Sequence, residues 1–254
     1  MAHRLGGLQH AVLASLALSC SAAIASGLQV SPISLQLDAH ATANGIWLSN
    51  SGDAPLNAQV RVLHWTQTGG ADQLEPSRGL IISPPMLVLA PGERQLVRVI
   101  RAGAARSAHE DAYRILIDEL PVAAHADTAG RAAGTGTQAL QFVLRYSVPV
   151  FLVPSGVAAS TPQLQGRVVR DNGQSVLEIE NTGTMHAQLG NLVHVDDRGH
   201  RSDLVSGLLG YVLAGQTMRW PLEDTNNRLA GGHLLSRING EPGEQTVAAV
   251  PTSP

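Results

Sequence analysis

The sequence contains no lysine, and all 17 basic residues of the 254-residue chain are arginines, set against 20 acidic residues. The formal net charge is -3 and the isoelectric point lies near 6.3. This balance argues against a nucleic-acid-binding protein that relies on a basic surface. A site that needs a cation must use a guanidinium, a planar and always charged group suited to bidentate binding of carboxylates.

Cysteine is nearly absent as well, since Cys20 is the only one. It lies in an N-terminal stretch in which a basic residue precedes a short apolar run and then small residues. This order predicts a secretory signal peptide at residues 1–25, cleaved after Ala25 and too short to span a membrane. A lipoprotein acylated at Cys20 is the alternative, but Ala17 stands where that signal has leucine. We expect an exported protein that folds without disulfides.

Motifs of enzymes are missing too. The chain has no G-x-S-x-G elbow, no H-E-x-x-H pair and no phosphate-binding loop. Aromatic residues make up only 3% of the sequence, too few to favour a sugar-stacking platform. His194 and His200 flank an Asp-Asp-Arg-Gly turn that could hold a metal, but a solvated hairpin is the simpler interpretation. We therefore expect no enzyme, no metal site, no cofactor and no small-molecule substrate.

Short alternating stretches between turn residues fill the rest of the chain, and no run has helical periodicity beyond a turn or two. The pattern predicts an all-β fold of two immunoglobulin-like sandwiches in tandem, at 26–153 and 154–254, joined by a turn-rich linker. Pro32 predicts an edge strand or one that switches sheets, and Asn172-Gly173 predicts a type I′ hairpin. The expected strands are 28–37, 45–50, 56–66, two joined by Pro91-Gly92 within 83–99, 112–120, 138–154, 164–170, 175–180, 186–195, 208–213, 216–222, 233–238 and 245–250.

The longest strand signal is the stretch 138–154, which follows a loop rich in Ala, Gly and Thr. In it Leu140, Phe142 and Leu144 alternate with more polar neighbours, so that a pleated strand places them in one apolar row. Alternation alone indicates an ordinary core strand of a closed sandwich.

Several motifs in the chain resemble those of the PapD-like periplasmic chaperones of pilus assembly. Their order and spacing match the family over residues 28–154. In the second half, Leu208 to Gly215 followed by Arg219-Trp220 resembles the archaic branch, whose pili include the Csu and spore-coat-U types. The motifs of the first half are Pro84-Pro85, Leu89-Ala90-Pro91-Gly92, Val97-Arg98-Val99, Tyr113-Arg114, Glu119-Leu120-Pro121 and the long strand that runs into Phe151 and Pro154.

The resemblance implies a periplasmic, ATP-independent chaperone that acts by donor-strand complementation, of which chaperone–pilin complexes are a known instance. A pilin-like subunit lacks the last strand of its sandwich, and the last strand of the chaperone's first domain fills the gap. Transferred to this chain, the donor strand is 138–148, and Leu140, Phe142 and Leu144 enter the subunit groove. The implied partners are pilin-like subunits and an outer-membrane usher, with no nucleic acid and no insertion into a membrane.

Classical members of the family anchor the subunit's C-terminal carboxylate with an arginine of the first strand and a lysine of the last. The matching places here are Ile33 or Ser34 and Pro149, none of which is basic. The remaining candidates are Arg114 and Arg145, whose guanidinium groups suit a carboxylate. The alternative for each is an arginine that is solvated or paired within its own sheet.

A rival interpretation is an exported structural or adhesive surface protein built of immunoglobulin-like domains. Pilins usually have one domain and an N-terminal donor segment. The two domains and the internal strand of this chain favour the chaperone.

Overall fold

The structure is a computed structural model that describes residues 27–103, 108–121, 143–154, 161–223 and 229–252. Every regular element in these ranges is a β-strand, so the prediction of an all-β fold is confirmed. No helix in them is long and apolar enough to cross a membrane. The strands are β1 Leu28–Ser31, β2 Leu35–Leu37, β3 Ala43–Asn50, β4 Leu56–Thr68, β5 Ala71–Pro76, β6 Leu80–Ser83, β7 Met86–Leu89, β8 Arg94–Arg101, β9 Asp111–Leu120, β10 Arg145–Leu152, β11 Leu164–Asp171, β12 Gln174–Asn181, β13 Ala187–Val195, β14 Arg201–Val212, β15 Thr217–Pro221, β16 His233–Ile238 and β17 Glu244–Ala249.

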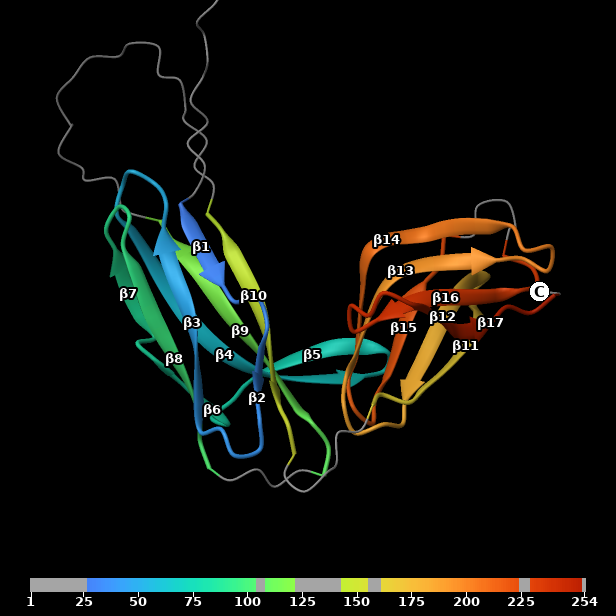
Figure 1. The fold of residues 1–254 in the computed structure, drawn as a ribbon, viewed down its shortest axis with the longest axis horizontal. Helices are drawn as coiled ribbons and strands as arrows, with labels where there is room; N and C mark the ends of the chain where they lie inside the picture. The colour runs from blue at the N-terminus through green and yellow to red at the C-terminus, as the bar shows by residue number, and fades with distance from the viewer. Residues whose placement is uncertain (1–26, 104–107, 122–142, 155–160, 224–228, 253–254) are drawn as a thin grey trace, which may run out of the picture.

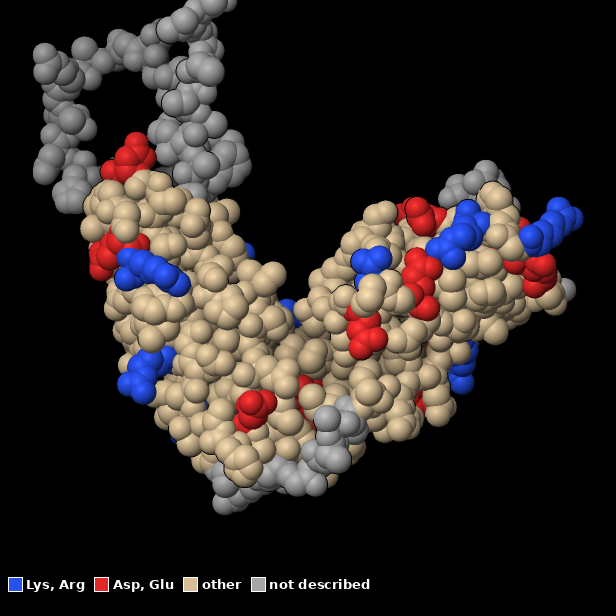
Figure 2. All heavy atoms as spheres, viewed as in Figure 1, with Lys and Arg blue, Asp and Glu red and all other residues tan. Residues whose placement is uncertain are grey.

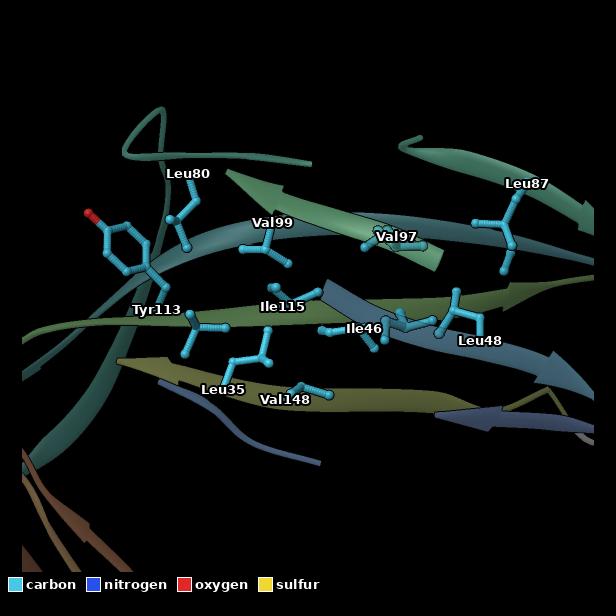
Figure 3. Packing of buried hydrophobic residues seen from close by; sticks show 14 of the residues in the cluster. Leu35, Ile46, Leu48, Leu80, Leu87, Val97, Val99, Tyr113, Ile115 and Val148 are labelled. Atoms are coloured by element: carbon cyan, nitrogen blue, oxygen red, sulfur yellow. The ribbon is translucent and has the colours of Figure 1, made fainter. Parts of the chain in front are cut away.

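The first ten strands form a sandwich of two sheets, here called the first domain. One sheet has the order β1-β3-β8-β6, and the other has the order β2-β10-β9-β4-β5 with β7 also bonded to β4. Alternate residues of facing strands meet between the sheets, as Ile46 and Val97 of one sheet and Ile115 and Val148 of the other do in Figure 3. These four side chains are 3% exposed or less. The alternating pattern seen in the sequence is therefore the inner face of the sandwich.

The last seven strands form a second domain around its own core. Their sheet has the order β14-β13-β16-β17-β11-β12-β15. The predicted hairpin is present as β11 and β12, and both of its turn residues have positive φ, 49° for Asn172 and 81° for Gly173. Leu177, Ile179 and Leu234 are fully buried in the core of this domain.

Two features place the domains relative to one another. The hairpin of β4 and β5 leaves the first sandwich and reaches the second domain, as Figure 1 shows. There Gly70 bridges to Met218 of β15, and the Arg219 amide donates to the Gly70 carbonyl at 3.2 Å. A small apolar cluster of residues from both domains fills the contact beside it, and the two lobes leave an open hollow between them (Figure 2). The buried members of the apolar cluster are Trp65, Ala112, Phe151 and Leu213.

The strands differ from the predicted ones in several places, and β6, which ends where the predicted stretch 83–99 begins, is one of them. The stretch 28–37 is split at Pro32 into β1 and β2, which belong to different sheets, so the expected switch occurs. The sequence pattern missed β5 because all its residues are exposed and mostly polar. It also missed the first half of β14, in which only Leu204 and Val205 are half-buried and the other residues are exposed. The two cores fall on either side of residue 154, while the exact boundary at 153/154 stays a prediction.

Candidate functional site

Strand β10 has one open edge. It pairs with β9 along its whole length, from Arg145 to Leu152. On its other side β2 is its only partner among the described strands, and that pairing is confined to Val150–Leu152. The backbone edge from Arg145 to Pro149 therefore faces no strand within the described ranges. Such an edge is a template for pairing with a strand of another chain.

The side chains of β10 alternate between the core and the outer face. Tyr146, Val148 and Val150 pack in the core of the first domain. Leu144 precedes the strand and continues its pairing through its carbonyl, which accepts from the Glu119 amide at 2.9 Å, while its own amide donates to the Glu119 side chain at 3.3 Å. By this alternation it shares the face of Tyr146 and is half-buried. The other two predicted donor residues, Leu140 and Phe142, lie outside the described residues.

Arg145 lies at the start of β10 and is paired within its own sheet. Its Nε atom donates to Oδ1 of Asp118, the residue opposite on β9. Arg61 of β4 donates to the other oxygen, Oδ2, at 2.6 Å. Burial raises the pKa of the Asp118 carboxyl, but hydrogen bonds from Arg145 and then Arg61 outweigh it, so the pKa lies below its usual value. One carboxylate thus ties β10 to β9 and β4.

Arg114 lies further along β9, next to the domain contact. Its guanidinium carbon is 3.7 Å from the ring centroid of Trp65 and 5.2 Å from that of Tyr211, which belongs to the second domain. No carboxylate of the described residues is within ion-pair distance of it. Burial lowers the pKa of Arg114, while Tyr211 and then Asp72 act in the opposite direction. The ordinary pKa of a guanidinium is so high that Arg114 stays charged at neutral pH.

The structure does not bring the two predicted anchor arginines together. Arg145 is opposite Asp118, and Arg114 is opposite Pro149. Along β9, the position opposite Arg145 is residue 118, which is four residues (118 minus 114) from Arg114. Four residues of a strand span about 13 Å. Arg114 is, however, the direct cross-strand neighbour of Pro149, the place where classical relatives carry the lysine. A cation is therefore present beside that place, on the adjacent strand.

A second close contact between the domains was not predicted from the sequence. Glu110, just before β9, bonds through Oε2 to the His186 amide at 2.8 Å and to its Nδ1 atom at 2.6 Å. The His186 ring is stacked on Phe151, with centroids 3.5 Å apart and planes inclined by 5°. Glu110 and His186 are 76 positions apart in the chain, so no local sequence pattern could have paired them.

The turn that was considered as a metal site is held by hydrogen bonds. Asp196 accepts from the amides of Arg198 and His200, at 2.9 and 2.8 Å. His194 is buried, and its Nε2 atom bonds to the Gly231 carbonyl. Within the part of the chain that the structure describes, no group of three metal-ligating side chains occurs.

Comparison with known proteins agrees with this fold. A family model described as pili and flagellar-assembly chaperone, PapD N-terminal domain, matches residues 27–158, just over half of the chain. The chain belongs to this PapD-like family of pilus chaperones. Its members are periplasmic chaperones of the chaperone–usher pathway and have no enzymatic activity, so the prediction of a non-enzymatic protein is confirmed. No curated protein matches the chain.

Solved structures of PapD-like chaperones share its two-domain architecture. One is the CsuC–CsuE chaperone–tip adhesion subunit pre-assembly complex from archaic Csu pili of Acinetobacter baumannii, with 23% identity, a TM-score of 0.67, and coverage of 87% of this chain and 96% of that one. Another is the Salmonella enterica SafA pilin in complex with the SafB chaperone, with 14% identity, a TM-score of 0.60, and coverage of 87% and 96%. The prediction of two immunoglobulin-like sandwiches is confirmed.

Proposed function

We propose that this PapD-like chaperone binds pilus subunits by donating residues 138–148 as the missing strand of the subunit. The observation that carries the proposal is the open edge of β10 from Arg145 to Pro149. An incoming subunit strand can add there by backbone hydrogen bonds, while alternate side chains fill its groove. In this proposal Leu140, Phe142 and Leu144 are the inserted side chains.

The energies support a tight but reversible complex. Each inserted apolar side chain contributes about 1.5–3 kcal/mol, and each backbone hydrogen bond contributes about 0.5–1.5 kcal/mol. Association itself costs roughly 4–15 kcal/mol in lost rigid-body freedom. The contacts therefore exceed the cost of association by a modest free energy, so that the subunit is held in the chaperone and can later be released.

We propose that Arg114 binds the subunit's C-terminal carboxylate. It is the arginine beside Pro149, lies at the contact between the domains and has no acidic partner in the described ranges. Arg145 was predicted as a second anchor, but its Nε donor is already bonded to Asp118. We assign Arg145 the task of fixing the start of the donor strand to β9.

The remaining steps follow from the family. We propose that residues 1–25 direct export to the periplasm and that the loaded chaperone delivers the subunit to an outer-membrane usher. The motif at 208–215 and the likeness to the Csu complex favour the archaic branch. Residues 26–153 and 154–254 are then the two domains of the mature chaperone.

Strand donation can be tested by site-specific thiol labelling, because the chain without residues 1–25 contains no cysteine. Single cysteines are placed at each position from 140 to 144, and labelling rates are measured with and without a pilin-like subunit from the same genome. We expect protection at 140, 142 and 144 and continued labelling at 141 and 143. Equal protection at all five positions, or at none, contradicts donation of this strand in this register.

A further inference from the structure

The Arg114 guanidinium is bracketed by aromatic rings from both domains. Trp65 comes from β4 of the first domain, and Tyr211 comes from β14 of the second. The two rings also touch one another edge to face, with centroids 5.3 Å apart and planes inclined by 79°. The position of the Arg114 side chain thus depends on a contact that exists only when the domains are docked.

The Trp65 ring is held firmly on its own side. It is 1% exposed, and its Nε1 atom donates to Oδ1 of Asp72 at 2.9 Å. Asp72 lies on β5 and accepts a second hydrogen bond from the Gln67 side-chain amide at 3.0 Å. Asp72, whose charge acts on the pKa of Arg114, is therefore engaged by Trp65 and Gln67 and forms no ion pair with the arginine.

Tyr211 is held by the same network from the other domain. The Gln67 side-chain amide donates to the Tyr211 carbonyl at 2.9 Å, and its oxygen accepts from the Leu213 amide at 2.9 Å. The Tyr211 hydroxyl accepts from the Gln188 side chain at 3.2 Å. One buried glutamine of the first domain thus fixes the strand that carries the ring.

Such a bracket changes what the arginine can do. A guanidinium has two faces and an edge of N–H donors, and a carboxylate binds at the edge. A ring beneath the guanidinium attracts the cation and orients its edge. An arginine that is already ordered loses less freedom when it binds, which raises affinity. An arginine without the rings retains its charge but has many more orientations.

We propose that Tyr211, with Trp65, is a positioning residue for Arg114, so that the second domain completes the carboxylate anchor carried by the first. The inference rests on the proposed anchoring role of Arg114. Removal of the Tyr211 ring weakens recognition of the subunit carboxylate and leaves the donated strand and its groove contacts as they are.

The test compares a subunit that ends in its natural carboxylate with the same subunit carrying a C-terminal amide, prepared by ligation. The probe is a pilin-like subunit from the same genome, and dissociation constants are measured for the wild-type chaperone, Tyr211→Phe and Tyr211→Leu. We expect the wild type to prefer the carboxylate by tenfold or more. Tyr211→Phe retains this preference, because the ring faces the guanidinium and the hydroxyl bonds only to Gln188 in the described ranges.

Tyr211→Leu is expected to bind the carboxylate form about three- to thirtyfold more weakly, the usual size of a cation–π contact, and the amide form as the wild type does. In the Arg114→Ala background the same substitution has no effect. If Tyr211→Leu weakens both forms equally, or neither, the positioning role is wrong. If it lacks a wild-type thermal transition, Tyr211→Met takes its place, since methionine keeps bulk without a ring.

The two proposals fail in different ways. A wild-type chaperone that binds both forms equally overturns the anchor, and with it the positioning role. A wild type that prefers the carboxylate, together with an unchanged preference in Tyr211→Leu, overturns the positioning role alone.

Discussion

The Nδ1 atom of His186 lies 2.6 Å from Oε2 of Glu110, and this contact joins the two domains. The Glu110 side chain is 1% exposed and that of His186 16%, so the contact is shielded from water. We expect His186→Ala to lower the free energy of unfolding by about 1–3 kcal/mol, because the buried carboxylate loses its side-chain partner and keeps only the backbone amide of residue 186. Urea unfolding measures the loss.

The control for this prediction is His186→Gln, which can still donate to Glu110 but loses the stack on Phe151. It is expected to lie between the wild type and His186→Ala. Equal stability of His186→Ala and the wild type would show that the contact contributes nothing.

The Gln67 side chain forms another polar contact between the domains. Its side chain bonds to Asp72, to the Tyr211 carbonyl and to the Leu213 amide. Gln67→Leu leaves two backbone groups of the second domain without partners, at a cost of about 1–3 kcal/mol each where they stay buried. We expect small-angle scattering to show a wider range of domain orientations. Thr68→Ala, at the exposed neighbouring position, should scatter as the wild type does.

Local patterns in the sequence were enough to predict the sandwich. In β4, Ala58 and Val60 point into the core while Arg61 points out, as alternation requires. Trp65 lies on the outer row by the same rule, yet it is buried, because the second domain covers it. Alternation thus predicts which face of the sheet a residue occupies. Whether that face is exposed to solvent depends on the contact with the second domain.

The site was predicted only in part for the same reason. Arg114 could be singled out because the family's usual cations are missing from a chain without lysine. Its bracket could not, since Tyr211 comes from a strand almost one hundred positions later and no short motif links the two. Asp118 also gave no signal of its role, because its two arginine partners come from different strands.

Arg114 and Arg145 can be separated by substitution. Arg114→Ala is expected to weaken binding of a pilin-like subunit about 10- to 100-fold, the equivalent of one charge-assisted contact of about 1.5–3 kcal/mol. Arg145→Ala should cost less than about 1 kcal/mol, because its side chain is 65% exposed and Arg61 still serves Asp118. Isothermal titration of a pilin-like subunit into each variant measures the two affinities. An equal loss of affinity in both variants would mean that Arg114 and Arg145 anchor the carboxylate together.

Asp118 should make the stability of the first domain depend on pH in the acidic range. Its pKa in the folded state lies below the usual 3.8, so its ionised form stabilises the fold above that pH, and this contribution is lost as pH falls through the folded pKa. Asp118→Asn is expected to lower the free energy of unfolding by about 1–3 kcal/mol at pH 7. The gap from the wild type should close below about pH 4. A gap that stays constant down to pH 2 would mean that its charge is not the cause.

The donor strand can be tested against the simplest alternative, in which its apolar row belongs to the chaperone's own core. Phe142→Asp places a charge where the proposal inserts a side chain into the subunit, and burying an unpaired carboxylate costs several kcal/mol. We expect loss of the subunit complex in co-purification and an unchanged thermal transition of the free chaperone. Val148→Asp is the matched comparison, because Val148 is 3% exposed in the core and its substitution should unfold the first domain. If Phe142→Asp lowers the transition as Val148→Asp does, Phe142 is a core residue and the strand is not donated there.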